Sequence, residues 1–67
     1  MHRTDVREWL QRIRGEYAEI PDLHLTEHQA HRLWGLDPVM CRALLDRLVR
    51  AGLLRRTDKA TYIRTGK

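Results

Sequence analysis

The sequence has a single cysteine, Cys41, and it contains no phenylalanine, serine or asparagine. One cysteine excludes an intramolecular disulfide and a metal site built from cysteines alone. Small extracellular domains usually carry several disulfides, so a reducing cytoplasm is the expected location. No apolar segment follows Met1 as it would in a secretory signal. No apolar run approaches the roughly 20 residues that span a bilayer, so we expect no membrane contact.

The length of 67 residues predicts one domain, covering residues 1–67. A chain of this size buries only about 60% of the surface that its unfolded form exposes. Enzyme pockets typically occupy about 300–1,000 Å³, which leaves little room for one beside the core. There is no serine nucleophile and no glycine-rich phosphate loop. We therefore expect a protein that is not an enzyme and that uses no cofactor.

Helical periodicity predicts three helices. The first covers about residues 5–20, with Thr4 or Asp5 as its N-cap and Glu8 in capping-box spacing. Its apolar stripe follows a period of three and four residues and consists of Val6, Leu10, Ile13 and Tyr17, with Trp9 and Ile20 beside it. The second covers about residues 27–34, begins at a Thr26–Gln29 capping box and has Ala30, Leu33 and Trp34 on its apolar side.

The third helix is predicted over about residues 38–51. Asp37 is a favourable N-cap, Pro38 suits the first helical position, and Gly52 ends the helix. Its inner face consists of Cys41, Leu44, Leu45 and Leu48. A link of three or four residues containing glycine, between the second and third helices, is typical of a helix-turn-helix unit.

After Gly52 the period changes to that of strands. The segments 53–56 and 61–64 predict a hairpin over about residues 53–64, with residues 57–60 as its turn. The turn lacks Asn-Gly or Asp-Gly, so its geometry stays open. Alternation in residues 22–25 suggests a short additional edge strand.

Positive charge is concentrated in the second part of the sequence. Residues 1–41 hold five arginines against seven acidic residues, a net charge of −2. Residues 42–67 hold six arginines and two lysines against Asp46 and Asp58, a net charge of +6. This asymmetry favours a polyanionic partner for the basic half, although a solvated basic face would give the same composition.

The stretch from Leu44 to Arg56 resembles the passage from recognition helix to wing in bacterial winged helix-turn-helix regulators, the MarR-like families among them. Its leucines and the sequence Gly52-Leu53-Leu54 match their pattern L-x-x-L-x-x-x-G-L-[LIV]. The resemblance covers about residues 24–64. It implies a fold that is mainly α with a small β-hairpin, a three-helix winged helix-turn-helix domain. It also implies a transcription regulator that binds double-stranded DNA, associated with the bacterial nucleoid.

On this resemblance, the helix from Pro38 would enter the major groove, and Arg42 would pair with guanine O6 and N7. The rest of the leading face would be Val39, Met40 and Ala43, with thymine methyls as partners for the first two. Phosphate contacts would come from Arg47, Arg50, Arg55, Arg56, Lys59 and Arg64. The tip at Asp58 and Lys59 would lie beside a phosphate backbone or a minor groove. Asp46, near this interface, has the helical spacing to pair with Arg42 or Arg50.

Several alternatives remain open. Winged helices also serve as protein-interaction modules, and here the Val39–Met40 face or the first helix could bind a protein partner or a second copy. His24, His28 and His31 have helical spacing but no further ligand, so we interpret them as surface residues rather than a metal site. Cys41, Trp9 and Trp34 are interpreted as core residues, since they lie on or beside apolar stripes.

Overall fold

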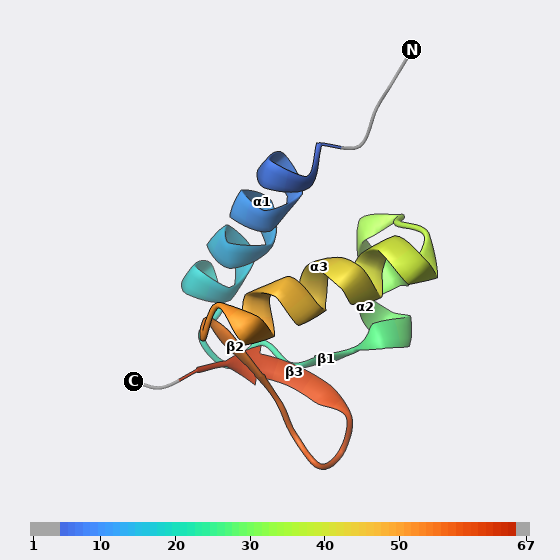
Figure 1. Cartoon of the computed structure of the whole chain (residues 1–67). Helices are drawn as coiled ribbons and strands as arrows, with labels where there is room; N and C mark the ends of the chain where they lie inside the picture. The colour runs from blue at the N-terminus through green and yellow to red at the C-terminus, as the bar shows by residue number, and fades with distance from the viewer. Residues whose placement is uncertain (1–4, 66–67) are drawn as a thin grey trace.

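The computed structural model describes residues 5–65 as three helices and a three-stranded antiparallel sheet (Figure 1). In chain order the elements are α1 (Val6–Glu19), β1 (Leu25–Thr26), α2 (Glu27–Trp34), α3 (Pro38–Arg50), β2 (Leu54–Arg56) and β3 (Thr61–Arg64). These bounds confirm the three helices, the hairpin and the short strand near residue 25. Thr4, the alternative N-cap of the first helix, lies outside the described residues. No helix within residues 5–65 has the length and apolar character needed to cross a membrane.

Side chains cap the start of every helix. The Asp5 carboxylate accepts a hydrogen bond from the Arg7 amide at 3.0 Å, and Asp37 accepts from the amides of Val39 and Met40 at 3.0 and 3.3 Å. Thr26 and Gln29 form the expected reciprocal capping box. These bonds satisfy amides that have no partner within the helix, so the helix starts follow directly from local sequence.

Two glycines allow the chain to leave its helices sharply. Gly35 after α2 and Gly52 after α3 have φ angles of 65° and 80°, a left-handed conformation that glycine adopts without steric cost. The amide of Leu53 donates to the Leu48 carbonyl, and that of Gly52 to the Val49 carbonyl. This is the Schellman arrangement, which satisfies the last carbonyls of a helix. At the end of α2, the left-handed conformation of Gly35 turns the chain so sharply that three residues, 35–37, suffice to join α2 to α3.

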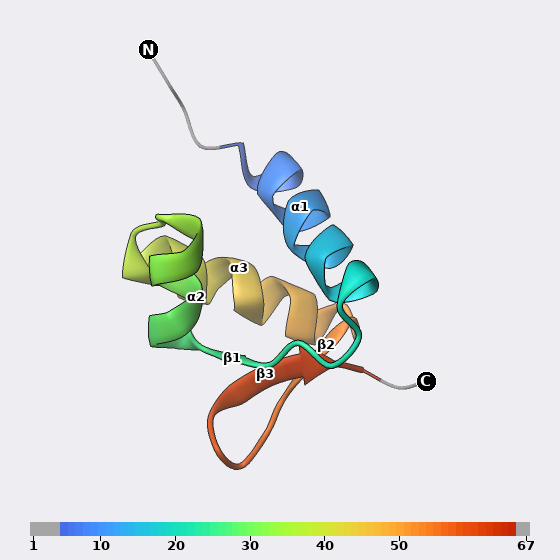
Figure 2. The same cartoon turned by 180° about the vertical axis from the view of Figure 1, so that it is seen from behind.

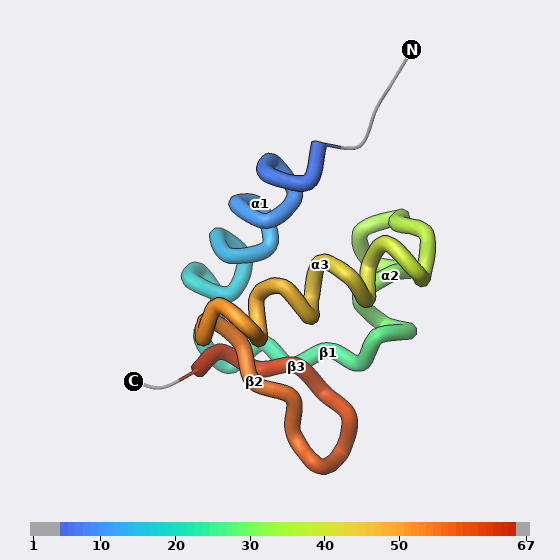
Figure 3. The backbone as a smooth tube through the Cα atoms, viewed as in Figure 1, coloured from blue at the N-terminus to red at the C-terminus, as the bar shows by residue number. Residues whose placement is uncertain are grey.

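The sheet has the order β1-β3-β2, which places the hairpin against the connector that precedes α2. Leu25 pairs with Tyr62, and Arg56 pairs with Tyr62 from the other side. In the hairpin turn, the Ala60 amide donates to the Thr57 carbonyl and the Thr57 amide to the Thr61 carbonyl. Ala60 has a φ of 62°, the position where a three-residue hairpin loop favours glycine. The tube in Figure 3 shows this turn projecting away from the helices.

α3 runs through the middle of the molecule, with α1 on one side and the sheet on the other (Figures 1 and 2). The core draws on every helix and strand, and its buried residues are Ile13, Tyr17, Leu25, Ala30, Trp34, Leu36, Cys41, Leu44, Leu45, Leu48, Leu54 and Tyr62. Two expectations were wrong. Leu33, assigned to the apolar side of α2, is 58% exposed, and Ile20 is 53% exposed because α1 has ended before it.

Candidate nucleic-acid interface

The outward side of α3 is the first part of the candidate interface. Its buried side is formed by Cys41, Leu44, Leu45 and Leu48, all on one half of the helix circumference. Val39, Arg42, Ala43, Arg47 and Arg50 are exposed, and Asp46 is half-buried. At 3.6 residues per turn, Arg42 and Arg47 lie about 140° apart around the axis. The helix therefore carries these two arginines on opposite flanks of its outward side rather than side by side.

Val39 and Met40 have different surroundings although both follow Pro38. Val39 is 78% exposed, the most exposed of the large hydrophobic residues. Met40 is half-buried and packs against the core. The prediction that it lies on the exposed face of the helix was therefore partly wrong. The reason is angular: one residue further along the helix, the side chain turns toward the buried side. The apolar leading edge therefore consists mainly of Val39.

Arg42 pairs with α2 rather than with its own helix. Its Nε atom lies 3.7 Å from Oε2 of Glu27, and the Arg42 and Glu27 side chains are 65% and 38% exposed. The helical spacing had offered Asp46 as a partner for Arg42 or Arg50, and neither of these pairs is among the ion pairs of residues 5–65. Within residues 5–65, the ion pairs are Arg42–Glu27 and Arg12–Glu16. Arg42 lies on the flank of α3 that faces the start of α2, which brings it to Glu27.

Two buried tyrosines connect this pair to the core. The Tyr17 hydroxyl donates to the Tyr62 carbonyl at 2.8 Å, and the Tyr62 hydroxyl donates to Oε2 of Glu27 at 3.0 Å. Burial raises the pKa of both phenols to about 12, and for Tyr62 the hydrogen bond to Glu27 adds to the rise. The Asp46 carboxylate also raises the pKa of Tyr62, while the Arg56 guanidinium lowers it. Arg56 of the hairpin is the cross-strand partner of Tyr62, the residue whose hydroxyl binds Glu27.

The hairpin distributes its basic residues over two faces. Arg56 is opposite Tyr62 and Arg64 is opposite Leu54, so both arginines lie on the face that carries the buried strand residues. Arg55, opposite Ile63, lies on the other face. Lys59 is in the turn, and all four basic side chains are exposed. Arg56 and Arg64 thus share one face of the hairpin, whereas Arg55 lies on the other.

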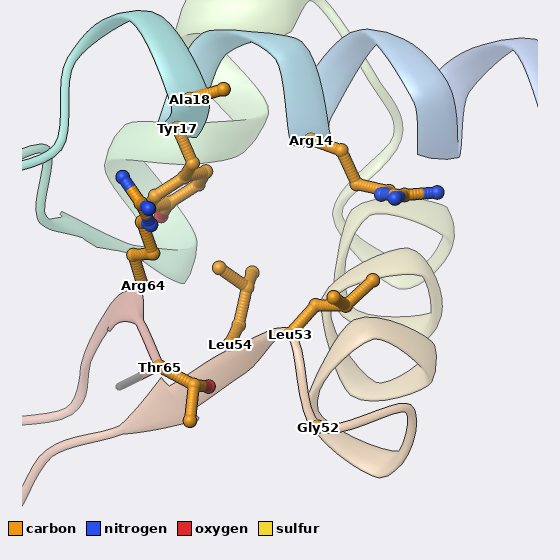
Figure 4. A pocket seen from close by; sticks show the side chains of 8 residues that line it. All are labelled: Arg14, Tyr17, Ala18, Gly52, Leu53, Leu54, Arg64 and Thr65. Atoms are coloured by element: carbon orange, nitrogen blue, oxygen red, sulfur yellow. The ribbon is translucent and has the colours of Figure 1, made fainter. Parts of the chain in front are cut away.

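Arg64 lines a separate cavity. A cavity of about 320 Å³ is lined by Arg14, Tyr17, Ala18, Gly52, Leu53, Leu54, Arg64 and Thr65. Figure 4 shows the Arg14 and Arg64 side chains on either side of Leu54. The volume is at the lower end of the range for ligand pockets, and the two guanidinium groups do not converge on one point. Arg64 therefore lines a cavity beside α1 and is not on the outward side of α3.

The two tryptophans and the cysteine, which were interpreted as core residues, are buried or half-buried in the structure. Trp34 is buried and its indole N–H donates to Glu16 Oε1 at 3.0 Å, while Trp9 is half-buried beneath the Arg12 guanidinium. Burial raises the pKa of the Cys41 thiol to about 11, and the Glu27 carboxylate adds to the rise, so the thiol stays protonated at neutral pH.

The histidines make local contacts instead of forming a cluster. His24 Nδ1 donates to the Asp22 carbonyl at 3.1 Å, and His31 Nδ1 donates to the Leu36 carbonyl at 3.2 Å. The His31 ring also meets that of His28 edge-on, with centroids 5.2 Å apart. Among residues 5–65, no group of three or more histidine, cysteine or acidic side chains is placed to hold a metal.

Sequence reasoning missed Glu27 and Tyr62. Glu27 is the first residue of α2, where an acidic side chain is explained by the helix dipole alone. Tyr62 is one of several residues in a short strand, and its contact with Glu27 spans 35 positions of the chain. The available signal was the strand alternation, which would have placed Tyr62 on the core side but not opposite Glu27.

Comparisons with known proteins identify no relative of this chain. No protein-family model matches the chain, and no curated protein or solved structure is significantly similar to it. The features of the molecule that bear on function are the exposed arginines on the outward side of α3 and the basic residues of the hairpin.

Proposed function

We propose that this chain is a winged helix-turn-helix domain that binds double-stranded DNA and acts as a small transcription regulator. In this proposal α2 and α3 are the helix-turn-helix pair, and the β2–β3 hairpin is the wing. The observation that carries it is that the outward side of α3 bears exposed arginines and that Arg56 of the hairpin, also exposed, is the cross-strand partner of Tyr62, whose hydroxyl binds the Glu27 carboxylate paired with Arg42.

The dimensions of α3 suit the major groove. A groove about 12 Å wide accepts one helix, and the thirteen residues of α3 extend over about 20 Å. Arg42 would read guanine through its two terminal amino groups, and Val39 offers methyl groups to thymine. Arg47, Arg50, Arg56 and Lys59 would contact phosphates, which position the protein without reading sequence.

A binding assay with two arms tests the proposal. Duplexes selected from a random pool by the protein are labelled, and their affinity is measured by fluorescence anisotropy against unselected duplex. We expect enrichment of a sequence containing guanine, and we expect Arg42→Ala to reduce the preference for it. Failure to bind any duplex at low salt would refute DNA binding.

The second candidate function is a protein-interaction module. It is favoured by the exposure of Val39, because an apolar side chain 78% exposed on a helix suits a protein partner as well as a base edge. Under this alternative Val39→Asp abolishes capture of a partner while Arg42→Ala leaves capture intact. The DNA-binding proposal predicts that Arg42→Ala reduces duplex preference by more than Val39→Ala does.

A further inference from the structure

Glu27 is held from the interior of the protein. Its Oε2 atom accepts the hydrogen bond of the Tyr62 hydroxyl at 3.0 Å. Tyr62 is 1% exposed, and Tyr17 holds the backbone carbonyl of the same residue at 2.8 Å. The carboxylate at the surface therefore has a position that is set by two buried aromatic rings rather than by solvent.

The same oxygen faces the guanidinium of Arg42 at its Nε atom, 3.7 Å away. Nε is the donor closest to the aliphatic chain, so a guanidinium with a partner at Nε can still offer its two terminal amino groups to guanine O6 and N7. Glu27 thus leaves this pair of donors available for a bidentate contact with a base. A side chain that is already oriented loses less conformational freedom on binding, which increases its discrimination.

The carboxylate also changes the electrostatic character of Arg42. An arginine paired with a carboxylate is close to neutral as a unit, so it attracts phosphates less than an unpaired arginine does. Asp46, one turn after Arg42 on α3, adds negative charge near the same arginine. Arg42 is therefore suited to a directional contact with a base rather than to general attraction of the backbone.

We propose that Glu27 is a positioning residue that determines the sequence specificity of this surface, by presenting the Arg42 guanidinium to guanine and by weakening its attraction for phosphates. The inference rests on the proposed function. Tyr62 takes part by fixing Glu27, so specificity at the surface depends on a hydroxyl inside the protein. Neither residue touches DNA in this account.

Glu27→Gln provides the test, because the amide keeps an acceptor for Tyr62 and removes the charge. Affinity is measured by anisotropy for the selected duplex and for an unselected duplex. We expect the ratio of the two affinities to fall about tenfold, the lower part of the range for one bidentate contact. We also expect affinity for unselected duplex to rise about two- to threefold, since Arg42 becomes available to phosphates.

Glu16→Gln is the matched control. Glu16 also accepts a hydrogen bond from a buried aromatic side chain, Trp34, and pairs with an arginine, Arg12, but it lies on α1. This variant makes the same change in net charge, so any effect of charge alone appears in both variants. We expect Glu16→Gln to leave the affinity ratio unchanged.

Tyr62→Phe keeps the test decisive should Glu27→Gln not fold, as judged by circular dichroism. Removing only the hydroxyl should reduce the ratio about threefold while Glu27 retains its charge. An unchanged ratio in the folded variants, together with a reduced ratio in Arg42→Ala, would overturn the role of Glu27 and leave DNA binding intact. Absence of any preferred duplex for the unmodified protein would overturn both proposals.

Discussion

Two glutamates of this protein make the same set of contacts in two different regions. Glu16 on α1 accepts a hydrogen bond from the Trp34 indole and pairs with Arg12, whereas Glu27 on α2 accepts one from the Tyr62 hydroxyl and pairs with Arg42. We call these sets the Glu16 triad and the Glu27 triad. Each connects a buried aromatic ring to an exposed arginine through a carboxylate.

The two triads differ in what surrounds the arginine. Arg12 belongs to the same helix as Glu16, and its guanidinium lies 4.9 Å from the ring centroid of Trp9, so both of its partners are local. Arg42 comes from a different helix than its glutamate, and its exposed side chain lies on the outward side of α3. The Glu16 triad thus joins α1 to α2 with its arginine on the helix of the glutamate, whereas the Glu27 triad joins α2 to β3 and to the outward side of α3.

The largest effect is expected from a substitution in the core beneath both triads. Leu45 is completely buried in α3, so Leu45→Ala leaves a cavity that the surroundings fill only partly. We expect a loss of about 2–5 kcal/mol in the free energy of unfolding, which for so small a domain approaches its whole stability. Urea denaturation followed by circular dichroism measures this, and a loss below about 1 kcal/mol would contradict the assigned core.

Alkaline pH should lower the stability of the protein next, because the buried Tyr62 hydroxyl of the Glu27 triad and the Tyr17 hydroxyl behind it titrate, whereas the Trp34 indole of the Glu16 triad does not. The folded state raises the pKa of Tyr17 and Tyr62 from 10.0 to about 12 and that of Cys41 from 9.0 to about 11. The unfolded state therefore loses these protons first, and the stability they contribute is complete below about pH 9 and disappears as the pH rises to 12.

Thermal unfolding between pH 8 and 12 measures this fall. Tyr17→Phe removes one of the three titrating groups, so the free energy of unfolding of this variant should fall less steeply with rising pH than that of the unmodified protein. An equal slope in the variant and the unmodified protein would show that Tyr17 does not titrate as described.

Replacing the two arginines sharpens the comparison. Exposed ion pairs contribute about 0–1 kcal/mol, so Arg12→Ala and Arg42→Ala should both lower the melting temperature only slightly. Only Arg42→Ala should weaken binding of the selected duplex, by about 1–3 kcal/mol. Anisotropy and differential scanning calorimetry on both variants measure the two effects, and equal losses of binding would remove the distinction between the triads.

The smallest effect concerns the turn of the hairpin at Ala60, which belongs to neither triad. Ala60 adopts a left-handed conformation with a φ of 62°, and its Cβ makes that conformation costly. Ala60→Gly should stabilise the protein by about 0.5–1 kcal/mol, after the entropic cost of glycine in the unfolded chain is deducted. Affinity for duplex should not change. Destabilisation in urea would show that the turn is not strained at Ala60.

Local signals predicted most of the fold. Asp5, Thr26 and Asp37 cap their helices as expected, because a cap depends only on residues within one turn. The inner face of α3 was predicted residue by residue for the same reason. Leu33 was assigned wrongly, since the width of the apolar stripe on an eight-residue helix depends on what packs against it.

The candidate site was predicted less completely. The exposed basic residues of α3 and the hairpin follow from periodicity, yet the partner of Arg42 does not. Spacing along one helix favours Asp46, while the observed partner Glu27 is 15 positions earlier and reaches Arg42 only through the packing of α2 on α3. Tyr62, which binds Glu27, is separated from it by 35 positions of the chain. Contacts between elements depend on topology, which no single segment of the sequence specifies.

The salt dependence of duplex binding tests the central claim most directly. If about 4–6 phosphates are neutralised, the logarithm of affinity should fall with the logarithm of salt concentration at a slope of about −4 to −5. Lys59→Ala should reduce the magnitude of that slope by about one, and Arg42→Ala should leave it nearly unchanged because Glu27 already pairs with Arg42. A flat salt dependence, or no binding to any duplex at low salt, would contradict the account.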